Sequence, residues 1–210
     1  MQLLGKLKIK SREKIISFLD EETTGRMSTI DVNGYPQIIP MNFVFENNVI
    51  YLHSHIKGEK LENITRDPKV GFEVDRNLEF LPSYFFDPKD ASLADTFYIS
   101  VVIKGEGELV TEKNEMANAL NTLMKKYQPE GKYDPIKPND DVLQHVSVIK
   151  ITPKIMTGKY KIGQDLDKDS RLKLAEQIYK RNSPTMKETL KIMGVKISDA
   201  GLEITDEEEW

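Results

Sequence analysis

The sequence predicts a mainly β fold, in which a six-stranded antiparallel barrel carries short helices and a helical C-terminal tail. β-rich runs follow one another with tight-turn dipeptides between them, whereas a parallel sheet would alternate its strands with long helices. The richest run, residues 97–111, contains Gly105 and Gly107, and such glycines allow the bend that curls a sheet into a barrel. We therefore expect a barrel domain over residues 1–163 and a polar, helical extension over residues 164–210.

Turn-forming dipeptides separate the first three strands. Asn33-Gly34 tolerates the two positive φ angles of a tight hairpin turn, and Asn47-Asn48 can take a similar role. We expect strands over residues 26–32, 36–45 and 49–54.

Apolar spacing assigns the remaining elements. Alternating apolar residues over 69–75 indicate a half-buried strand, and Pro153 is expected to end the last strand. An apolar stripe with the helical period marks residues 112–127, and in residues 57–67 Asn63 falls on a polar helix face. The remaining strands are expected over 69–75, 97–111 and 145–152, and the helices over 11–22, 57–67, 112–127, 172–181 and from Ser183-Pro184, with a frayed end at 206–210.

The composition limits the classes of function. With 34 Asp and Glu against 30 Lys and Arg, the net charge is −4, which argues against a nucleic-acid binder. No run approaches the roughly 20 apolar residues of a membrane span, and the start is too poor in apolar residues for a secretory signal, so we expect a cytoplasmic protein. The chain has no cysteine and three histidines, so we expect no metal site. Redox chemistry would therefore require an organic cofactor.

Residues 53–60 (HSHIKGEK), where the third strand passes into a helix, form the first candidate site. Free backbone N–H groups and the positive end of the helix dipole make such a junction a natural site for a phosphate. Ser54 offers a hydroxyl, Gly58 lets the backbone come close, and Lys60 supplies a positive charge. The alternative is structural: Ser54 caps the helix, while Lys57 and Lys60 are solvated.

Two further groups could surround a ligand held at this junction. Arg26, Ser28 and Thr29 on the first strand would add donors if that strand neighbours the third, although such residues are usually just exposed. The segment 41–43 (Met41, Asn42, Phe43) places an amide beside apolar groups, which suits recognition of a flat heteroaromatic ring.

Three motifs lie between residues 26 and 75: a D-x-x-G-x-P turn, a P-x-N-F strand, and an aromatic-x-H-small-x-x-x-G-x-K turn. They are formed by Asp31, Gly34 and Pro36; by Pro40, Asn42 and Phe43; and by Tyr51, His53, Ser54, Gly58 and Lys60. With these motifs the chain resembles the pyridoxamine 5′-phosphate oxidase-related FMN-binding split barrels, most closely their nitroimidazole-resistance reductase-like branch. The likeness continues through YISVVIKGEGELV and VSVIKITPKIMTGK and covers roughly residues 15–163.

The resemblance implies a homodimer with two FMN molecules in clefts between the subunits. By motif match, Ser54, the backbone around 55–58 and Lys60 hold the phosphate with help from Arg26, while residues 27–29 and 41–43 line the flavin ring. His53 matches a histidine beside the flavin and is the candidate catalytic residue; the alternative is a hydrogen-bonded strand histidine. The expected cofactor-binding residues are Arg26, Met27, Ser28, Thr29, Met41, Asn42, Phe43, His53, Ser54, His55, Gly58 and Lys60.

Two features depart from the family pattern. His55 stands where a small residue is expected, which could alter the pocket wall. The tail after residue 165 has no counterpart and could cover the pocket.

We expect an FMN-dependent oxidoreductase that passes electrons or hydride to a small acceptor such as a nitro compound or a quinone. Oxidation of pyridoxamine phosphate itself is not expected, because no Arg-rich set for a second phosphate is evident. Two alternatives stay open. One is a non-catalytic flavin carrier, and the other is a pocket for haem or a deazaflavin, with His53, His55 or His145 as the haem ligand.

Overall fold

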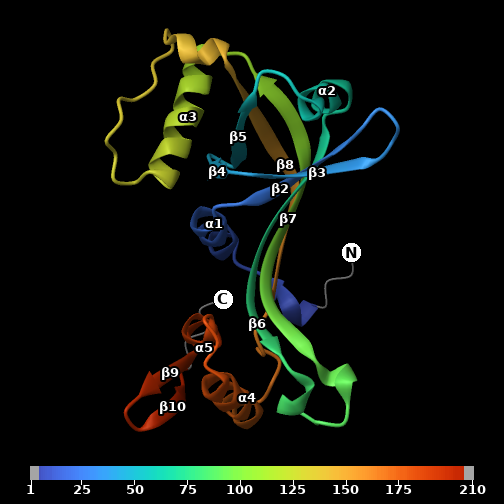
Figure 1. The fold of residues 1–210 in the computed structure, drawn as a ribbon, viewed down its shortest axis with the longest axis vertical. Coiled ribbons are helices and arrows are strands. Elements are labelled where there is room, and N and C mark those ends of the chain that lie inside the picture. The colour runs from blue at the N-terminus through green and yellow to red at the C-terminus, as the bar shows by residue number, and fades with distance from the viewer. Residues whose placement is uncertain (1–4, 206–210) are drawn as a thin grey trace. The chain divides into compact units, whose positions relative to one another are not determined.

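A computed structural model describes residues 5–205 (Figure 1), so the fraying expected at residues 206–210 lies outside the described part of the chain. The chain divides into two compact units. The barrel unit comprises residues 15–74 and 101–157, and the terminal unit comprises the described parts of residues 1–14, 75–100 and 158–210. The domain boundary expected at residue 163 stays a prediction.

One eight-stranded sheet dominates the structure (Figure 1). Its strands are β1 (Lys8–Ile9), β2 (Gly25–Ile30), β3 (Pro36–Met41), β4 (Phe43–Glu46), β5 (Val49–His55), β6 (Lys69–Leu81), β7 (Asp95–Val110) and β8 (Val146–Lys161). They follow the order β3-β2-β6-β7-β8-β5-β4, and β1 pairs with β8 beside this path. The pairs β2–β3, β2–β6, β4–β5 and β5–β8 are antiparallel.

Asn42 joins the two ends of this path. β3 and β4 stand at opposite ends of the strand order, yet β3 ends at Met41 and β4 begins at Phe43. One residue spans at most about 3.6 Å of chain, so the two edges of the sheet meet there. The sheet therefore curls into a barrel whose end strands β3 and β4 are joined through the chain at Asn42, with no ladder between them among the described residues, and the mainly β fold expected from the sequence is confirmed.

Inward-facing side chains fill the barrel unit. In β2, Gly25, Met27 and Thr29 are buried and alternate with more exposed residues. The rings of Phe43 and Phe72 meet edge to face, with their centroids 5.2 Å apart. Gly25 leaves the space for this pair, because a Cβ atom there would lie 2.1 Å from the Phe72 ring.

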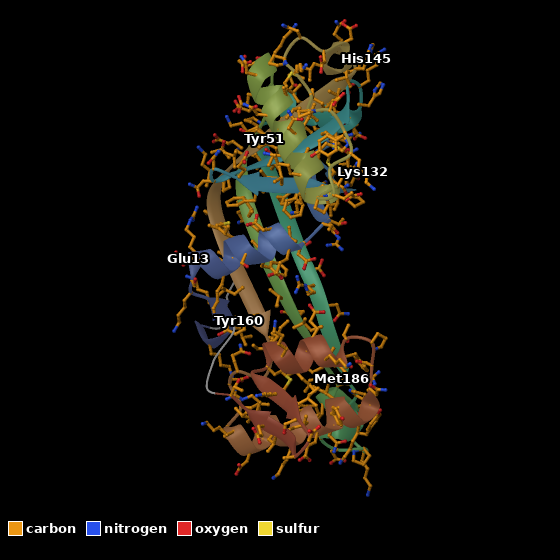
Figure 2. All side chains as sticks on the ribbon, turned by 90° about the vertical axis from the view of Figure 1, so that its left-hand side faces the viewer. Glu13, Tyr51, Lys132, His145, Tyr160 and Met186 are labelled. Atoms are coloured by element: carbon orange, nitrogen blue, oxygen red, sulfur yellow. The ribbon has the colours of Figure 1, made fainter. Side chains whose placement is uncertain are left out.

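Helices and single 3-10 turns connect the strands. The helices are α1 (Arg12–Glu21), α2 (Glu59–Arg66), α3 (Lys113–Tyr127), α4 (Lys168–Arg181) and α5 (Met186–Ile192), and the 3-10 turns are η1 (Gly5–Leu7), η2 (Ser83–Phe85), η3 (Ala91–Leu93) and η4 (Asp141–Gln144). α3 covers a second apolar cluster of the barrel unit, to which its Met116 and Leu120 contribute. On the same helix, Glu115 accepts a hydrogen bond at 2.8 Å from Tyr51 of β5, which Figure 2 labels. Within residues 5–205, no helix is both long and apolar enough to cross a membrane.

The terminal unit is organised around a buried carboxylate. Glu79 of β6 is 4% exposed and accepts hydrogen bonds from Ser183 and, at 3.0 Å, from Thr185. Arg181, the last residue of α4, lies 3.4 Å from the same carboxylate. Thr189 of α5 bonds the Leu78 carbonyl at 3.3 Å. These contacts attach α4 and α5 to β6.

Several strands differ from the expected ones. The strand expected over 36–45 is divided at Asn42, and the one expected to end at 75 continues as β6 to Leu81. β8 does not end at Pro153. It pairs with β5 over residues 146–151 and with β1 at residues 158 and 159, so the proline lies between these two partners, where its missing N–H breaks no bond on that side.

The tail and one turn also differ from expectation. The tail contains a hairpin, β9 (Val195–Ser198) paired with β10 (Gly201–Ile204), in addition to its helices. Asn47 and Asn48 both have positive φ, as predicted for their turn, but at Asn33-Gly34 only the glycine does. There the carboxylate of Asp31 accepts bonds from the N–H groups of Asn33 and Tyr35, both at 2.8 Å, and shapes a wider turn.

Candidate functional site

The corner between β5 and α2 has an open helix start. Gly58 is the N-cap residue, with φ 149° and ψ 148°, and the described part of the chain gives the helix no side-chain cap. This φ favours glycine. A Cβ atom on Gly58 would lie 3.6 Å from the ammonium nitrogen of Lys60, so the charge lies directly over the glycine. Glu59, the first residue of α2, is held by the side-chain amide of Gln37.

The hydroxyl of Ser54 lacks a hydrogen-bond partner within residues 5–205, as expected for a group that binds a ligand. Its side chain is buried, and among the described residues its hydroxyl oxygen has no hydrogen-bond partner. Leaving a buried hydroxyl unsatisfied costs about 1–3 kcal/mol. The structural alternative for Ser54 is wrong, because this hydroxyl does not cap α2.

The two histidines of β5 lie on the other face of the strand. His53 and His55 are exposed, while Ser54 between them is buried, as the alternation of a strand requires. His55 Nδ1 accepts a hydrogen bond from the Lys57 N–H at 3.1 Å. The third histidine, His145, labelled in Figure 2, ends η4 just before β8. A ligand group bound by Ser54 therefore meets a different face of β5 from one that contacts His53.

Two of the four predicted residues of β2, Arg26 and Thr29, already have side-chain partners. Arg26 pairs with Glu73 at 3.0 Å. Thr29 is 1% exposed and accepts a hydrogen bond from Asn63 of α2 at 3.1 Å. Met27 is fully buried, so it can reach a ligand only through its backbone. Ser28 is partly exposed.

The segment 41–43 crosses the closure of the barrel. Asn42 is exposed and Met41 partly so, whereas the Phe43 side chain is fully buried and only its backbone can face a ligand. The Tyr127 hydroxyl accepts a hydrogen bond from the Phe43 N–H at 2.8 Å and lies 3.0 Å from the Phe43 carbonyl. Lys126 lies over the Phe43 ring, 4.0 Å from its centroid.

Burial alters the pKa of Lys126 and Tyr127, the two α3 residues that contact Phe43. The link between β3 and β4 at residues 41–43, together with these two side chains, is called the joint below. Loss of solvation lowers the pKa of Lys126 to about 8, against the opposing effect of the nearby Asp20 and Glu22 carboxylates. Burial also raises the pKa of Tyr127, so its hydroxyl keeps its proton at neutral pH. The joint is thus held by an ammonium group with a lowered pKa and by a protonated phenol.

The sequence did not indicate three of these residues as part of the site. Asn63, placed on a polar face of α2, is 1% exposed and bonds β2. Tyr127 ends the apolar stripe of α3, and a buried tyrosine hydroxyl needs a partner, which is a signal that could have identified it. Lys126 gave no such signal, because its contacts depend on the packing of distant segments.

A polar surface cleft of about 460 Å³ also lies in the barrel unit, beside α3. Glu46, Asn118, Thr122, Lys125 and Tyr133 contribute to its lining. None of the predicted site residues lines it, so this cleft is separate from the β5–α2 corner.

A family model described as pyridoxamine 5′-phosphate oxidase matches residues 11–160. The chain belongs to this family. The resemblance drawn from the three motifs is therefore confirmed at the level of the family. Among curated proteins, no match to this pyridoxamine 5′-phosphate oxidase family member was found.

Solved structures share the fold of this pyridoxamine 5′-phosphate oxidase family protein. A candidate 5-nitroimidazole antibiotic resistance protein from Bacteroides thetaiotaomicron is 24% identical with a TM-score of 0.62, over 73% of this chain and 86% of that one. The flavocytochrome Anf3 from Azotobacter vinelandii is 17% identical with a TM-score of 0.67, over 87% and 79%. A FAD and haem binding protein from Mycobacterium smegmatis is 15% identical with a TM-score of 0.64, over 78% of each chain. At these identities the likeness concerns the fold alone.

Proposed function

We propose that this chain binds FMN, with the phosphate at the corner between β5 and α2. The observation that carries the proposal is the buried Ser54 hydroxyl, which has no partner among the described residues and stands where the motif match puts a phosphate ligand. A phosphate oxygen would accept its hydrogen bond. The uncapped N–H groups at the start of α2 and the ammonium group of Lys60 would add donors and positive charge.

The flavin ring would meet the joint of the barrel. Asn42 is exposed there beside the partly exposed Met41, which offers an amide next to an apolar surface. Arg26 would assist the phosphate only by exchanging its bond to Glu73 for one to the ligand. Ser28 would add a hydroxyl from the same strand.

We further propose that two copies of the chain form a homodimer around the cofactor. The hairpin of β2 and β3 exposes four apolar side chains, of which Val32 and Tyr35 are 78% and 70% exposed, together with Ile30 and Ile38. Clustered exposed apolar groups are typical of an interface. Analytical ultracentrifugation is expected to give twice the chain mass of 24.1 kDa. A monomer at micromolar concentration would contradict this part of the proposal.

The proposed activity is that of an oxidoreductase with a small acceptor, such as a nitro compound or a quinone. Bound FMN supplies the chemistry of accepting a hydride or electrons and passing them on. His53 is exposed on the opposite face of β5 from Ser54, so it would contact the acceptor rather than the phosphate. The alternative is a carrier without catalysis, and reoxidation rates of the reduced protein separate the two. One acceptor that reoxidises it far faster than others indicates an enzyme, whereas uniformly slow reoxidation indicates a carrier.

The absorption spectrum of the purified protein tests the cofactor first. Flavin bands are expected, and acid release followed by chromatography distinguishes FMN from FAD. A Soret band without flavin bands would overturn the proposal in favour of haem.

Lys60→Ala tests the phosphate assignment. Loss of one charged contact to a phosphate costs about 1.5–3 kcal/mol, so the affinity for FMN should fall roughly 10- to 150-fold. Lys104→Ala, which removes an exposed lysine of β7, is the matched control and should keep the affinity of the unaltered protein. Equal FMN affinity in the two variants would remove the phosphate from this corner.

A further inference from the structure

On one edge of β4, a tyrosine side chain binds the backbone of Phe43 at the position where a neighbouring strand would normally pair. In the β4–β5 ladder Phe43 stands opposite Leu52, but both its N–H and its carbonyl are within hydrogen-bond distance of the Tyr127 hydroxyl, at 2.8 and 3.0 Å. The two polar groups of a strand residue point to the same side of the strand, so those of Phe43 point away from β5. β4 ends the strand order, so within residues 5–205 no further strand pairs with it on that side. The Tyr127 hydroxyl therefore takes the place of the missing strand.

The same hydroxyl also reaches the connection into β2. It lies 2.6 Å from the Thr23 carbonyl, which precedes β2 by two residues. A phenol has one proton to donate and two lone pairs to accept with, so one hydroxyl can serve the N–H of Phe43 and the carbonyl of Thr23 together. Tyr127 thus connects the last turn of α3 to the start of β2 and to the start of β4.

The Phe43 side chain is fixed from the same helix. Its ring packs against Phe72 on one side, and Lys126 lies 4.0 Å from its centroid. Lys126 also donates a hydrogen bond at 2.8 Å to the carbonyl of Leu19 in α1. Consecutive residues of α3 therefore hold both the ring and the backbone of Phe43, and the exposed Asn42 is the residue immediately before it.

We propose that Tyr127 is a positioning residue for the flavin ring. Its hydroxyl fixes the backbone at Phe43, and Phe43 fixes the direction in which Asn42 presents its amide and its backbone groups. This inference rests on the proposed FMN site, because Asn42 is the residue expected to meet the ring. Tyr127 itself is bonded to protein carbonyls and an N–H group, so it acts through the joint rather than on the ligand.

The test compares Tyr127→Phe with Tyr51→Phe. Each variant loses one tyrosine hydroxyl that forms a hydrogen bond between α3 and a strand. The Tyr51 hydroxyl donates to Glu115, away from the joint. Both proteins are loaded with FMN and compared with the unaltered chain by flavin absorption, by FMN affinity and by midpoint potential. A role in stability alone would leave the spectrum and the potential of the bound flavin unchanged in a protein that remains folded.

In Tyr127→Phe we expect a displaced flavin absorption band and an FMN affinity about 5- to 50-fold lower, because the freed Phe43 N–H loses its acceptor. A tenfold change in the relative affinity for oxidised and reduced flavin would move the two-electron potential by about 30 mV. Tyr51→Phe should match the unaltered protein. If both folded variants bind flavin with the spectrum, affinity and potential of the unaltered chain, the positioning role is wrong while the FMN site stands. If the unaltered chain binds no flavin, the proposed function fails, and the positioning role fails with it.

Discussion

Asn63 of α2 donates a hydrogen bond to Thr29 of β2 at 3.1 Å, and each of these side chains is 1% exposed. The side-chain amide oxygen (Oδ1) of Asn63 in turn accepts a bond from Arg66 at 3.1 Å, and Arg66 also donates to the backbone carbonyl of Ile30. This network, whose Asn63–Thr29 bond is buried, fixes α2 against β2. The start of α2, where the phosphate is proposed to bind, is positioned by it.

Asn63→Leu should destabilise the barrel by about 1–3 kcal/mol, because the Thr29 hydroxyl is left buried without a donor. Urea unfolding gives the change in the free energy of unfolding. Asn118→Leu, at an exposed position of α3, is the control and should stay within about 0.5 kcal/mol of the unaltered chain. Adding Thr29→Val to Asn63→Leu should recover part of the loss, and a strictly additive double variant would show that the two side chains are not coupled.

Lys126 should make the free energy of unfolding depend on pH above about 8. Its pKa is lowered to about 8 in the folded chain by burial, whereas in the unfolded chain it returns to the usual value near 10.5. Between these values the unfolded state binds more protons, so stability rises with pH, and below about 8 the contribution is constant.

Lys126→Met removes this ionisation, so the stability of the unaltered chain relative to the variant should rise between pH 8 and 10.5, by less than the pKa difference alone would give because solvent partly screens this half-buried group. Chemical denaturation at a series of pH values measures the difference. Lys125→Met, which replaces an exposed neighbour, should follow the unaltered chain. A constant difference between Lys126→Met and the unaltered chain would contradict the burial of this ammonium group.

Gly105→Ala should destabilise the barrel through a backbone clash. A Cβ atom at Gly105 would lie 2.5 Å from the Thr152 carbonyl oxygen, and the backbone of β8 cannot move without disturbing its own pairing. Overpacking of this kind costs about 1–3 kcal/mol. At Gly71 the nearest atom would be the Ser28 Cβ at 3.6 Å, so Gly71→Ala is the matched control and should cost much less. Thermal unfolding of the two variants decides the point, and equal midpoints would show that the β7–β8 approach is not tight.

Glu79→Ala should loosen the terminal unit more than the barrel unit. The substitution leaves the hydroxyls of Ser183 and Thr185 without their acceptor and removes the partner of Arg181, at a cost of about 1–3 kcal/mol. Hydrogen exchange should speed up in α4 and α5 first. Glu106→Ala, which removes an exposed ion pair with Lys154, should leave both units as protected as before. Uniform loss of protection in Glu79→Ala would mean that the two units unfold together.

Local chemistry explains what the sequence could predict. The helical periods, the Asn47-Asn48 turn and the three motifs depend on neighbouring residues, and each of these agrees with the structure or with the family. The site at the β5–α2 corner stays a prediction of the same local kind, because Ser54, Gly58 and Lys60 lie within seven residues of each other.

The missed features depend on residues far apart in the sequence. Glu79 and Arg181 are separated by 102 positions and Lys126 and Leu19 by 107, and no local pattern relates such pairs. The extension of β8 beyond Pro153 was missed because the place of a proline in a sheet depends on which neighbouring strands end beside it. The assignment of Asn63 to a polar face failed because its partner, Thr29, belongs to a strand thirty-four residues earlier.

The carboxylate of Glu79 also affects the order in which the chain can be completed on the ribosome. Synthesis proceeds from the N-terminus at about 5–20 residues per second, so β6 is made several seconds before Arg181, Ser183 and Thr185 exist. Until these three residues leave the exit tunnel, the Glu79 carboxylate lacks the partners that it has in the folded chain. The barrel unit ends at residue 157 and can assemble earlier. Released chains that stop before residue 181 should therefore hold a protected barrel and a protease-sensitive β6 end.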